Sequence, residues 1–417
     1  MAVQVDVIHG RCPACTAACL QLDSDSDSLV FVLCGDTLRG DGGFSEALLR
    51  PRSRAPILDS GSTVECLYRL KQSLDRLNLS DIRVFTTPRG QEELLHYQEL
   101  LFTSVYSFDY KVEQLICPSC RGSTHTDSPG LRAQEDVSRF LQQLPALKGH
   151  VRVLKSTLIP ECFGHGFSTR TGGVSYIPTL SSLNLFSSSK RRDPRAVVME
   201  NKRRLALHAG FHPLPLCFVK VNHANEVWVF GEAEPDSYDS IVSNQTGVVL
   251  TAPGADCMPI LFADPVKKVI GAAHAGWKGT LMGVAMATVN AMVANFGCQV
   301  SDIVVAVGPS VGVCCFMLDR EQALDFTKVH PDCVPDPESA KPHVDIRLAN
   351  RVLLQKGGVL PGNIHDNLVK ERPPVTPCTS CHPEDYFSHV RDGLNFGTQV
   401  GFLWIKEAAE QTAPTET

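Results

Sequence analysis

Two short apolar runs joined by a polar turn constrain the fold of this chain more than any other feature of its sequence. Residues 258–262 and 269–273 are rich in small and branched apolar side chains, and Asp264-Pro265-Val266-Lys267 stands between them. Runs of this length, bounded by turn residues, are typical of two antiparallel strands. Further strands are predicted over residues 217–221, 227–230, 248–252 and 303–307.

The register of this hairpin predicts a pair of reactive side chains. If Pro265 and Val266 are the central turn residues, Cys257 and His274 lie directly opposite each other. Facing residues have Cβ atoms about 5 Å apart on one side of the sheet, so a thiolate and an imidazole can reach one metal ion. Two-residue hairpins favour other turn residues than Pro, so a slip by one residue is the alternative, and it places the two side chains on opposite faces.

His223 is the best candidate for a third ligand, because it lies in a polar interruption between two strand-like runs. Two imidazoles and one thiolate make an open zinc site, since three protein ligands leave a fourth position for water or substrate. Asp256, next to Cys257, is a candidate acid–base group or a partner that orients a ligand imidazole. Two alternatives stay open: Cys257 and His274 are ordinary core residues, or they are the nucleophile and base of a cysteine hydrolase.

The chain is predicted to contain two domains and a tail. Residues 1–145 should form a smaller accessory α/β domain, and a turn-rich passage at residues 123–130 lies near its end. Residues 146–408 should form the catalytic domain, and residues 409–417 a disordered tail.

Helices are predicted over residues 64–77, 91–101, 194–209 and 281–296. Asp193-Pro194 fits the start of the third helix and Gly210 its end, while Gly297 ends the fourth. The segment Lys190-Arg191-Arg192 is predicted to be an exposed basic run just before the third helix.

Composition narrows the class of protein. With 39 Lys plus Arg against 45 Asp plus Glu, the net charge is −6, so no broad attraction to nucleic acid is expected. The sequence has neither a run of about 18 apolar residues nor a basic-then-apolar N-terminal signal, so we expect no membrane span and a cytoplasmic location. In that reducing compartment, the 16 cysteines favour metal binding or catalysis over disulfides.

Cysteine motifs carry further predictions. Cys12-Pro-Ala-Cys15 and Cys117-Pro-Ser-Cys120 have the spacing of metal-binding knuckles and could share a structural zinc, with free or buried thiols as the alternative. Cys378-Thr-Ser-Cys381-His382 matches a haem-attachment motif, but the expected reducing compartment argues against haem. The vicinal pair Cys314-Cys315 is expected to pack under a strand.

Six segments of the C-terminal part occur in a distinctive order. They are residues 165–173 (His-Gly-Phe-Ser-Thr-Arg-Thr-Gly-Gly), 182–185 (Ser-Leu-Asn-Leu), 255–261 (Ala-Asp-Cys-Met-Pro-Ile-Leu), 273–279 (Ala-His-Ala-Gly-Trp-Lys-Gly), 308–315 (Gly-Pro-Ser-Val-Gly-Val-Cys-Cys) and 387–393 (Phe-Ser-His-Val-Arg-Asp-Gly). These segments resemble the laccase-domain family, once called multicopper polyphenol oxidoreductases, whose bacterial members include YfiH- and YlmD-like proteins. With its extra N-terminal domain, the chain resembles the animal purine nucleoside phosphorylases of this family.

The resemblance implies a four-layer α/β/β/α mixed-sheet catalytic domain and a zinc ion held by His223, Cys257 and His274. It also implies phosphorolysis of adenosine, inosine, guanosine and methylthioadenosine, with adenosine deamination as a second activity. The chain departs from the family pattern at three positions, Phe186, Asn222 and Val390.

Phosphorolysis requires groups that hold phosphate against the ribose and stabilise the leaving purine. Arg170 is the first candidate for the phosphate or ribose and Arg391 the second, because guanidinium groups bind oxyanions through paired N–H donors. Asn184 offers a donor and an acceptor for a ribose hydroxyl or a base edge. Purine nucleosides and phosphate are therefore the expected substrates, and the N-terminal domain is a candidate surface for a protein partner or self-association.

Two other functions stay open from the sequence: a non-catalytic purine- or metal-binding adaptor, and a copper-dependent phenol oxidase. A multicopper centre needs clustered imidazoles, whereas the 14 histidines contain no His-x-His pair, so Zn²⁺ is favoured over copper. A single Cu²⁺ at the His/Cys/His group is the less favoured alternative, since Cu²⁺ binds such ligands more tightly than Zn²⁺ does.

Overall fold

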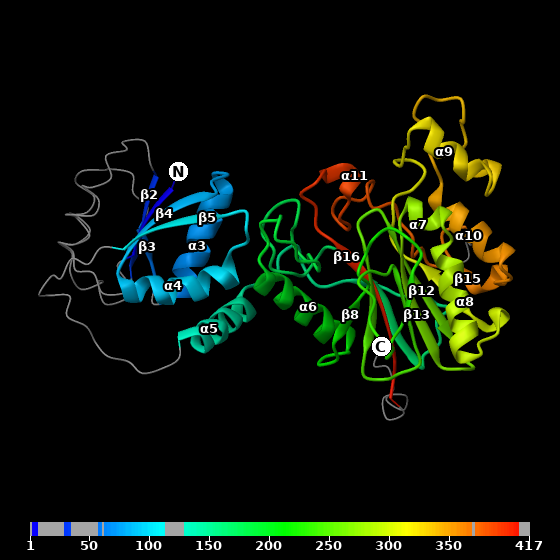
Figure 1. Cartoon of the computed structure of the whole chain (residues 1–417), viewed down its shortest axis with the longest axis horizontal. Helices are drawn as coiled ribbons and strands as arrows, with labels where there is room; N and C mark the ends of the chain where they lie inside the picture. The colour runs from blue at the N-terminus through cyan, green and yellow to red at the C-terminus, as the bar shows by residue number, and fades with distance from the viewer. Residues whose placement is uncertain are drawn as a thin grey trace, which may run out of the picture. The chain divides into compact units, whose positions relative to one another are not determined.

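The computed structural model describes residues 2–6, 29–34, 57–60, 62–112, 129–368 and 372–407 (Figure 1). The chain divides into two compact units, one of Met1–Pro145 with Ser187–Glu200 and one of Ala146–Phe186 with Asn201–Thr417. The predicted knuckles at Cys12-Pro-Ala-Cys15 and Cys117-Pro-Ser-Cys120 lie outside the described residues, as does the predicted tail. Each helix of the described part is too short or too polar to cross a bilayer.

Among its described residues, the first unit has a parallel five-stranded sheet with strand order β3-β2-β1-β4-β5 together with helices. Its elements are β1 (Ala2–Asp6), β2 (Leu29–Cys34), β3 (Ile57–Asp59), α3 (Thr63–Arg76), β4 (Asp81–Thr86), α4 (Pro88–Leu101), β5 (Ser107–Val112) and α5 (Pro129–Gln143). Helix α4 starts where Thr87 Oγ1 accepts the N–H of Gly90, with Pro88 at the first helical position. The α/β character predicted for this part of the chain is confirmed.

The carboxylate of Asp75, near the end of α3, binds several side chains of this unit. It lies 2.8 Å from Lys71 Nζ and 2.9 Å from Arg192 Nη1, and it accepts the hydroxyl of Tyr106. The prediction of an exposed basic run is wrong for Arg192, whose side chain is only 15% exposed. The reason is that the segment Ser187–Glu200 packs with the first unit, where the Asp75 carboxylate provides the countercharge.

The second unit contains two sheets. The six-stranded sheet has the order β15-β14-β12-β13-β10-β9, and the five-stranded sheet has the order β6-β7-β16-β11-β8. Both are mixed, since parallel and antiparallel pairs occur in each. The strands are β6 (Val153–Leu154), β7 (Phe163–Ser168), β8 (Leu216–Phe218), β9 (Val227–Val229), β10 (Ser240–Ser243), β11 (Val249–Gly254), β12 (Met258–Asp264), β13 (Val269–Ala275), β14 (Val304–Val307), β15 (Ile364–His365) and β16 (Gln399–Ile405).

Only two of the helices in this part were predicted, and the second of them begins later than predicted. They are α6 (Arg195–Ala209), α7 (Trp277–Leu281), α8 (Val284–Phe296), α9 (Arg320–Thr327), α10 (Ile346–Lys356) and α11 (His389–Asp392). The helix predicted over residues 281–296 begins only at Val284, because Gly283 has a φ of 78° and ends α7. Gly297, with a φ of 68°, ends α8 as predicted.

Strand β12 is apolar from Met258 to Ala263 because both of its faces are buried. Met258, Ile260 and Phe262 belong to a core shared with α8 and α10, whereas Leu261 and Ala263 belong to the core between the two sheets. Side chains alternate between the faces of a strand, so a strand buried on both sides has no polar face.

Strand β16 is buried in the same way on the other sheet. Its Leu403 packs between the sheets, while Val400, Phe402 and Trp404 pack with Leu205 of α6. The two sheets therefore face each other, with α8 and α10 against one and α6 against the other, as the ribbon of Figure 1 also shows. The predicted mixed α/β fold class is confirmed.

The turn between β12 and β13 is longer than predicted. Asp264 faces Val269 across the hairpin, so the loop consists of residues 265–268. The Asp264 carboxylate accepts the N–H groups of Val266 and Lys267 at 2.8 and 2.9 Å. An Asp followed by Pro suits the first two positions of such a turn, and this local chemistry selects the longer loop.

This longer loop changes the register at the predicted reactive pair. Pro259, and not Cys257, faces His274, so the predicted direct pairing is wrong by two residues. Because side chains alternate with a period of two, a shift of two leaves Cys257 and His274 on the same face as diagonal neighbours.

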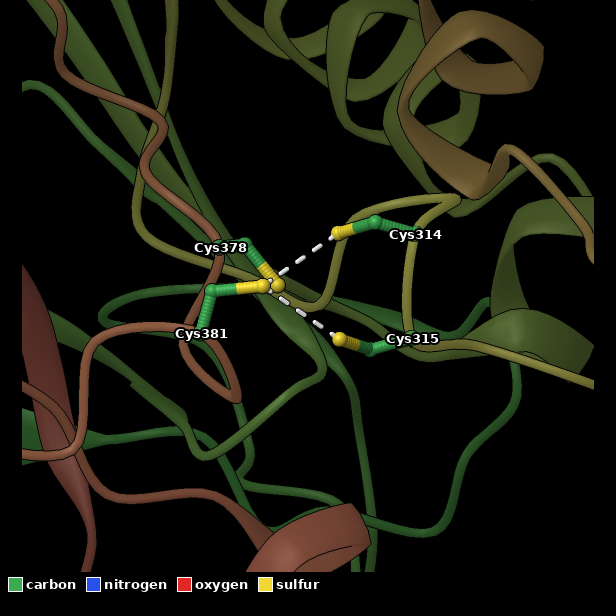
Figure 2. Close-up of side chains that lie close together, drawn as sticks. All are labelled: Cys314, Cys315, Cys378 and Cys381. Atoms are coloured by element: carbon green, nitrogen blue, oxygen red, sulfur yellow. Dashed lines mark hydrogen bonds between the residues drawn. The ribbon is translucent and has the colours of Figure 1, made fainter.

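Cys314 and Cys315 do not pack under a strand, which corrects the sequence expectation. Cys314 is exposed and Cys315 is half-buried. Both sulfurs face Cys378 and Cys381 (Figure 2). The sequence separation between the two pairs concealed this contact.

Candidate functional site

His223, Cys257 and His274 converge where β12 begins and β13 ends. One potential ligand atom from each lies within 4.8 Å of the others. His274 is in β13, Cys257 directly precedes β12, and His223 lies in the loop between β8 and β9. The two imidazole rings are 5.0 Å apart between centroids and stand at 87° to each other. The residues predicted as metal ligands therefore lie together, and their metal stays a prediction.

A buried carboxylate that the sequence analysis missed, Asp239, orients His274. Asp239 directly precedes β10, and the antiparallel pairing of β10 with β13 brings it beside His274. Its Oδ1 lies 2.8 Å from His274 Nδ1, and its carbonyl accepts the backbone N–H of His274 at 2.7 Å. An ionised carboxylate only accepts hydrogen bonds, so Nδ1 carries the proton and Nε2 is the nitrogen left to bind a cation.

The same carboxylate shapes the loop that carries His223. The N–H groups of Asn222 and Ala224 donate to Asp239 Oδ2 at 3.1 and 2.8 Å, and the N–H of His223 donates to Oδ1 at 3.1 Å. His223 has a φ of 64°, a left-handed conformation that non-glycine residues rarely adopt. Asp239 thus stabilises an unfavourable backbone conformation that points His223 toward Cys257.

Charge within this group favours a thiolate beside protonated imidazole when no cation is bound. Desolvation raises the pKa of Cys257, but the His274 and His223 rings outweigh it and bring the pKa down from 9.0 to about 6. Desolvation lowers the pKa of His274, but the Cys257 thiolate and Asp239 raise it from 6.5 to about 9. Burial alone would raise the pKa of Asp239, but the hydrogen bonds from His274 and Ala224 outweigh this effect, and the net shift of the pKa is downward. The resulting negative charge on Cys257 and Asp239 suits a divalent cation.

Gly276 leaves space directly next to the three side chains. A Cβ at this position would lie 3.1 Å from Cys257 Sγ and 3.2 Å from His223 Cδ2. Both distances are shorter than ordinary van der Waals contacts, so only glycine keeps this volume open. A site that needs a fourth coordination position requires such a gap, and the residues present therefore fit the open zinc site implied by the ligand set.

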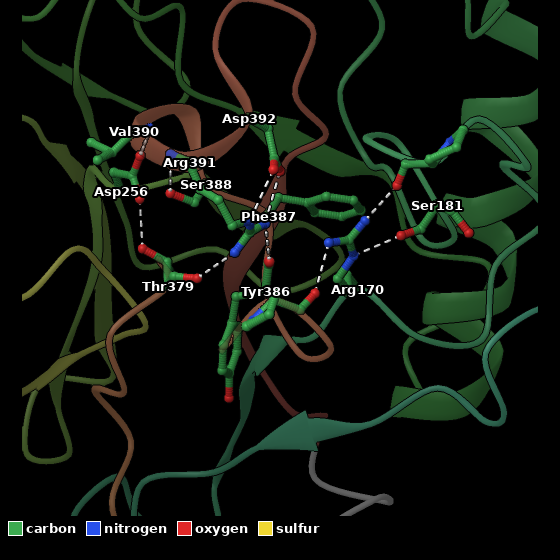
Figure 3. A network of polar contacts seen from close by, with 12 residues as sticks. Arg170, Ser181, Asp256, Thr379, Tyr386, Phe387, Ser388, Val390, Arg391 and Asp392 are labelled. Atoms are coloured by element: carbon green, nitrogen blue, oxygen red, sulfur yellow. Dashed lines mark hydrogen bonds and ion pairs between the residues drawn. The ribbon is translucent and has the colours of Figure 1, made fainter. Parts of the chain in front are cut away.

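Asp256 is held by two donors from the C-terminal part of the unit (Figure 3). Its Oδ1 accepts the hydroxyl of Thr379 at 2.7 Å, and its Oδ2 accepts the N–H of Val390 at 2.6 Å. Asp256 is buried and has a φ of 91°. The carboxylate next to Cys257 in sequence is therefore fixed in place, and Thr379 is a second contributor that the sequence analysis missed.

Arg391 belongs to the same network. Its Nη1 donates to the carbonyl of Thr379 at 2.9 Å, and its Nη2 donates to the carbonyl of Tyr386 at 2.9 Å (Figure 3). It also forms an ion pair with Asp392, at 2.8 Å. Arg391 is half-buried, so it combines a fixed position with access to solvent.

Arg170 and Asn184 are buried and hold backbone segments. The Nε, Nη1 and Nη2 atoms of Arg170 donate to the carbonyls of Ser181, Pro383 and Pro178, at 2.7, 2.7 and 2.8 Å. Asn184 Oδ1 accepts the N–H of Thr398 at 3.1 Å. These contacts favour a structural role for both residues, and their predicted contacts with substrate stay predictions.

Comparison with known proteins identifies the family. The sequence model of the family described as "Multi-copper polyphenol oxidoreductase laccase" matches residues 164–406. The protein named "Purine nucleoside phosphorylase LACC1" from Mus musculus is 50% identical over 399 residues, which cover 94% of this chain and 90% of that protein. The chain belongs to the laccase-domain family.

Two further relatives each match about three fifths of this laccase-domain chain. The crystal structure of YlmD from Geobacillus stearothermophilus superposes with a TM-score of 0.52 at 28% identity, covering 60% of this chain and 94% of that one. The protein named "Adenosine deaminase RL5", from an unknown prokaryotic organism, is 30% identical over 255 residues, or 58% of this chain and 93% of that protein.

The described residues offer few ligands for the several copper ions that the family description names. Among the described residues, the groups able to hold a metal are the His223/Cys257/His274 group and the four cysteines of Figure 2. A multicopper centre requires several clustered imidazoles, and the first group contains only two.

Proposed function

We propose that this laccase-domain protein is a purine nucleoside phosphorylase that also deaminates adenosine. Its substrates would be adenosine, inosine, guanosine or methylthioadenosine together with phosphate, and its products the purine base and the ribose 1-phosphate (or its methylthio form). The convergence of His223, Cys257 and His274 beside Asp239 carries this proposal. The names of the LACC1 and RL5 relatives support the two activities.

The proposed ligands are the Nε2 of His274, the thiolate of Cys257 and a ring nitrogen of His223. Bound there, Zn²⁺ would supply a Lewis acid with an open coordination position. Asp239 keeps the proton of His274 on Nδ1 and fixes the loop of His223, so both rings are oriented before a cation arrives.

In phosphorolysis, a phosphate oxygen forms a bond to C1′ while the bond from C1′ to the purine nitrogen breaks, and that nitrogen takes up a proton. In deamination, water adds at C6 of the purine and ammonia leaves. Both reactions need a group that transfers a proton to the leaving nitrogen. We assign this role to Asp256, whose carboxylate would take a proton from the attacking water or dihydrogen phosphate and pass it to the leaving nitrogen. Thr379 and Val390 hold this carboxylate in one position, and Asp256 directly precedes Cys257 in the chain.

Of the predicted substrate contacts, Arg391 is the one we favour for phosphate. Arg391 is half-buried and donates to the carbonyl of Thr379, whose hydroxyl donates to Asp256. A phosphate bound by Arg391 would therefore belong to the same polar network as Asp256. Arg170 and Asn184 would then act by holding the surrounding backbone, with Arg170 stacked 4.7 Å from the Phe387 ring centroid. We further propose a cytoplasmic location and an N-terminal unit that offers a surface to a protein partner or a second copy.

One assay tests the proposal. The full chain is incubated with inosine or adenosine, with and without phosphate, and the products are separated by chromatography. We expect hypoxanthine from inosine only when phosphate is present, and inosine from adenosine in either case. Cys257→Ala should abolish both activities, whereas Cys162→Ser, which removes another half-buried thiol of the same unit, should preserve them.

The other outcomes are equally specific. If Cys257→Ala retains either activity, that activity does not use the shared cation. Oxidation of phenols with bound copper and no effect of phosphate would support the oxidase alternative. Nucleoside binding without turnover would support the adaptor.

A further inference from the structure

Four cysteine sulfurs from two distant segments meet in the second unit. Cys381 Sγ lies 3.5 Å from Cys314 Sγ and 3.4 Å from Cys315 Sγ, and with Cys378 all four sulfurs lie within 4.8 Å of one another (Figure 2). In a tetrahedral four-thiolate zinc site, with Zn–S distances of about 2.3 Å, neighbouring sulfurs are about 3.8 Å apart. The spacing is therefore close to what a single Zn²⁺ requires.

A tight turn explains how two adjacent cysteines point the same way. The carbonyl of Gly312 accepts the N–H groups of Cys315 and Phe316 at 3.0 and 3.1 Å. In an extended strand, neighbouring side chains point to opposite faces. The turn removes that alternation, and Figure 2 shows the sulfurs of Cys314 and Cys315 both directed at the other pair.

The second pair is brought to the turn by backbone contacts. Cys378 and Cys381 are separated by two residues, a spacing typical of zinc knuckles. Ser310 and Cys378 form an isolated parallel bridge, and the N–H of Thr379 donates to the carbonyl of Ser310 at 3.0 Å. The protein backbone thus aligns both cysteine pairs, which lowers the entropic cost of assembling four ligands.

The surroundings of the sulfurs match a negatively charged thiolate cluster. The N–H of Gly312 donates to Cys378 Sγ at 3.3 Å, and a Cβ on Gly312 would lie 3.2 Å from Cys314 Sγ. Arg347 ties the same segments together through the carbonyls of Ser310 and Pro377. Its positive charge partly offsets the net charge of about −2 that four thiolates and one Zn²⁺ carry.

We propose that Cys314, Cys315, Cys378 and Cys381 bind one Zn²⁺, separate from the cation of the His223/Cys257/His274 group. Soft thiolate ligands in a tetrahedral arrangement select Zn²⁺ or iron, and we commit to Zn²⁺. On binding, the cation replaces the thiol protons, which pass to solvent. The proposal is independent of nucleoside turnover, because it requires only the four sulfurs.

The location gives this zinc a positioning role. Thr379 lies between Cys378 and Cys381, and its hydroxyl holds Asp256. A cation that cross-links the loop of Cys378 to the turn of Cys314 fixes Thr379, and through it the carboxylate next to Cys257. The zinc acts here through Thr379 and does not contact substrate.

The test counts zinc in the full chain, purified with a thiol reductant and without added chelator. We expect Cys314→Ser/Cys381→Ser to contain one Zn²⁺ per chain fewer than the unmodified protein. The matched control, Cys162→Ser/Cys217→Ser, removes two half-buried cysteines elsewhere in the unit and should contain as much Zn²⁺ as the unmodified protein. In Cys257→Ser, X-ray absorption at the zinc edge should show only sulfur neighbours, at about 2.3 Å.

Hydrogen exchange provides a second measurement that does not depend on recovery of the metal. Amides of residues 376–382 should exchange faster in Cys314→Ser/Cys381→Ser than in the control variant.

If Cys314→Ser/Cys381→Ser does not fold, Cys381→His, which replaces a thiolate with a ring nitrogen at an exposed position, should retain the second zinc. Unchanged zinc content in Cys314→Ser/Cys381→Ser, iron in its place, or disulfides among the four cysteines in freshly purified protein would each overturn the proposal. If the unmodified chain binds this zinc but does not turn over nucleosides, only the proposed function is refuted.

Discussion

Replacing Asp239 with Asn should weaken Zn²⁺ binding at the His223/Cys257/His274 group by about 10- to 100-fold, with a similar loss of nucleoside turnover. The substitution preserves the size of the side chain and removes its charge. It also leaves one acceptor oxygen where the carboxylate has two, so the Nδ1–H of His274 and the backbone N–H groups can no longer all be accepted. Both changes act on ligand orientation, although Asp239 itself is not a ligand.

The magnitude follows from the hydrogen bonds that Asp239 accepts. Its carboxylate takes the Nδ1–H of His274 and the backbone N–H groups of Asn222, His223 and Ala224. An amide has only one acceptor atom, so if its oxygen stays toward His274, the N–H groups of Asn222 and Ala224 meet an NH₂ group. Each unsatisfied donor costs about 1–3 kcal/mol, so the free energy of unfolding should fall by about 2 kcal/mol or more.

The assay is competition for Zn²⁺ with a chromophoric chelator, followed by urea unfolding of the same samples. Asp264→Asn is the matched control, because Asp264 is also buried, and one of its oxygens accepts both backbone donors at the turn between β12 and β13. An amide oxygen can keep both bonds, so this variant should bind Zn²⁺ like the unmodified chain. If Asp239→Asn binds Zn²⁺ as tightly as that control, the carboxylate does not orient the ligands and our account of the site is wrong.

Three further predictions address the site and each unit. Gly276→Ala should weaken Zn²⁺ binding by about tenfold or more, since overpacking costs about 1–3 kcal/mol, whereas Gly362→Ala, where a Cβ has no neighbour within 4 Å, should not change it. Burial lowers the pKa of His165 from 6.5 to about 4. Between these two pH values, His165 is therefore protonated in the unfolded chain and neutral in the folded chain. Stability should therefore fall by up to about 3 kcal/mol between pH 6.5 and 4, and urea titrations of His165→Gln should lack this part of the loss. In the first unit, Asp75→Asn should lower the free energy of unfolding by about 3 kcal/mol or more, because it leaves the buried Lys71 ammonium without its carboxylate at 2.8 Å; Lys71→Met should cost less in the same denaturation assay.

Local sequence signals predicted much of the secondary structure of this laccase-domain chain. Apolar runs predicted β12 and β13, and turn glycines predicted the ends of α6 and α8. In the second unit, the strands β6, β7, β10, β15 and β16 were missed. The residues of β7 include two glycines and a histidine, and β10 is only four residues long, so neither has a strong pattern of its own.

The contacts of the site depended on longer-range information. The predicted register of the hairpin between β12 and β13 was wrong because Asp264 and Pro265 favour a longer turn. The register shift is two residues, so Cys257 and His274 still lie on the same face of the sheet. Asp239 could not be found locally, since its role depends on the pairing of β10 with β13.

By itself, the sequence determined which side chains can act as metal ligands and which segments form strands and helices, because thiol and imidazole chemistry and apolar periodicity are local properties. The tertiary structure decided which of them meet. It brought Asp239 to His274 and Cys314 to Cys381, pairs whose proximity arises from strand pairing and loop packing over long stretches of chain. Packing of two buried sheets allows few registers, so it fixes contacts that no short segment specifies.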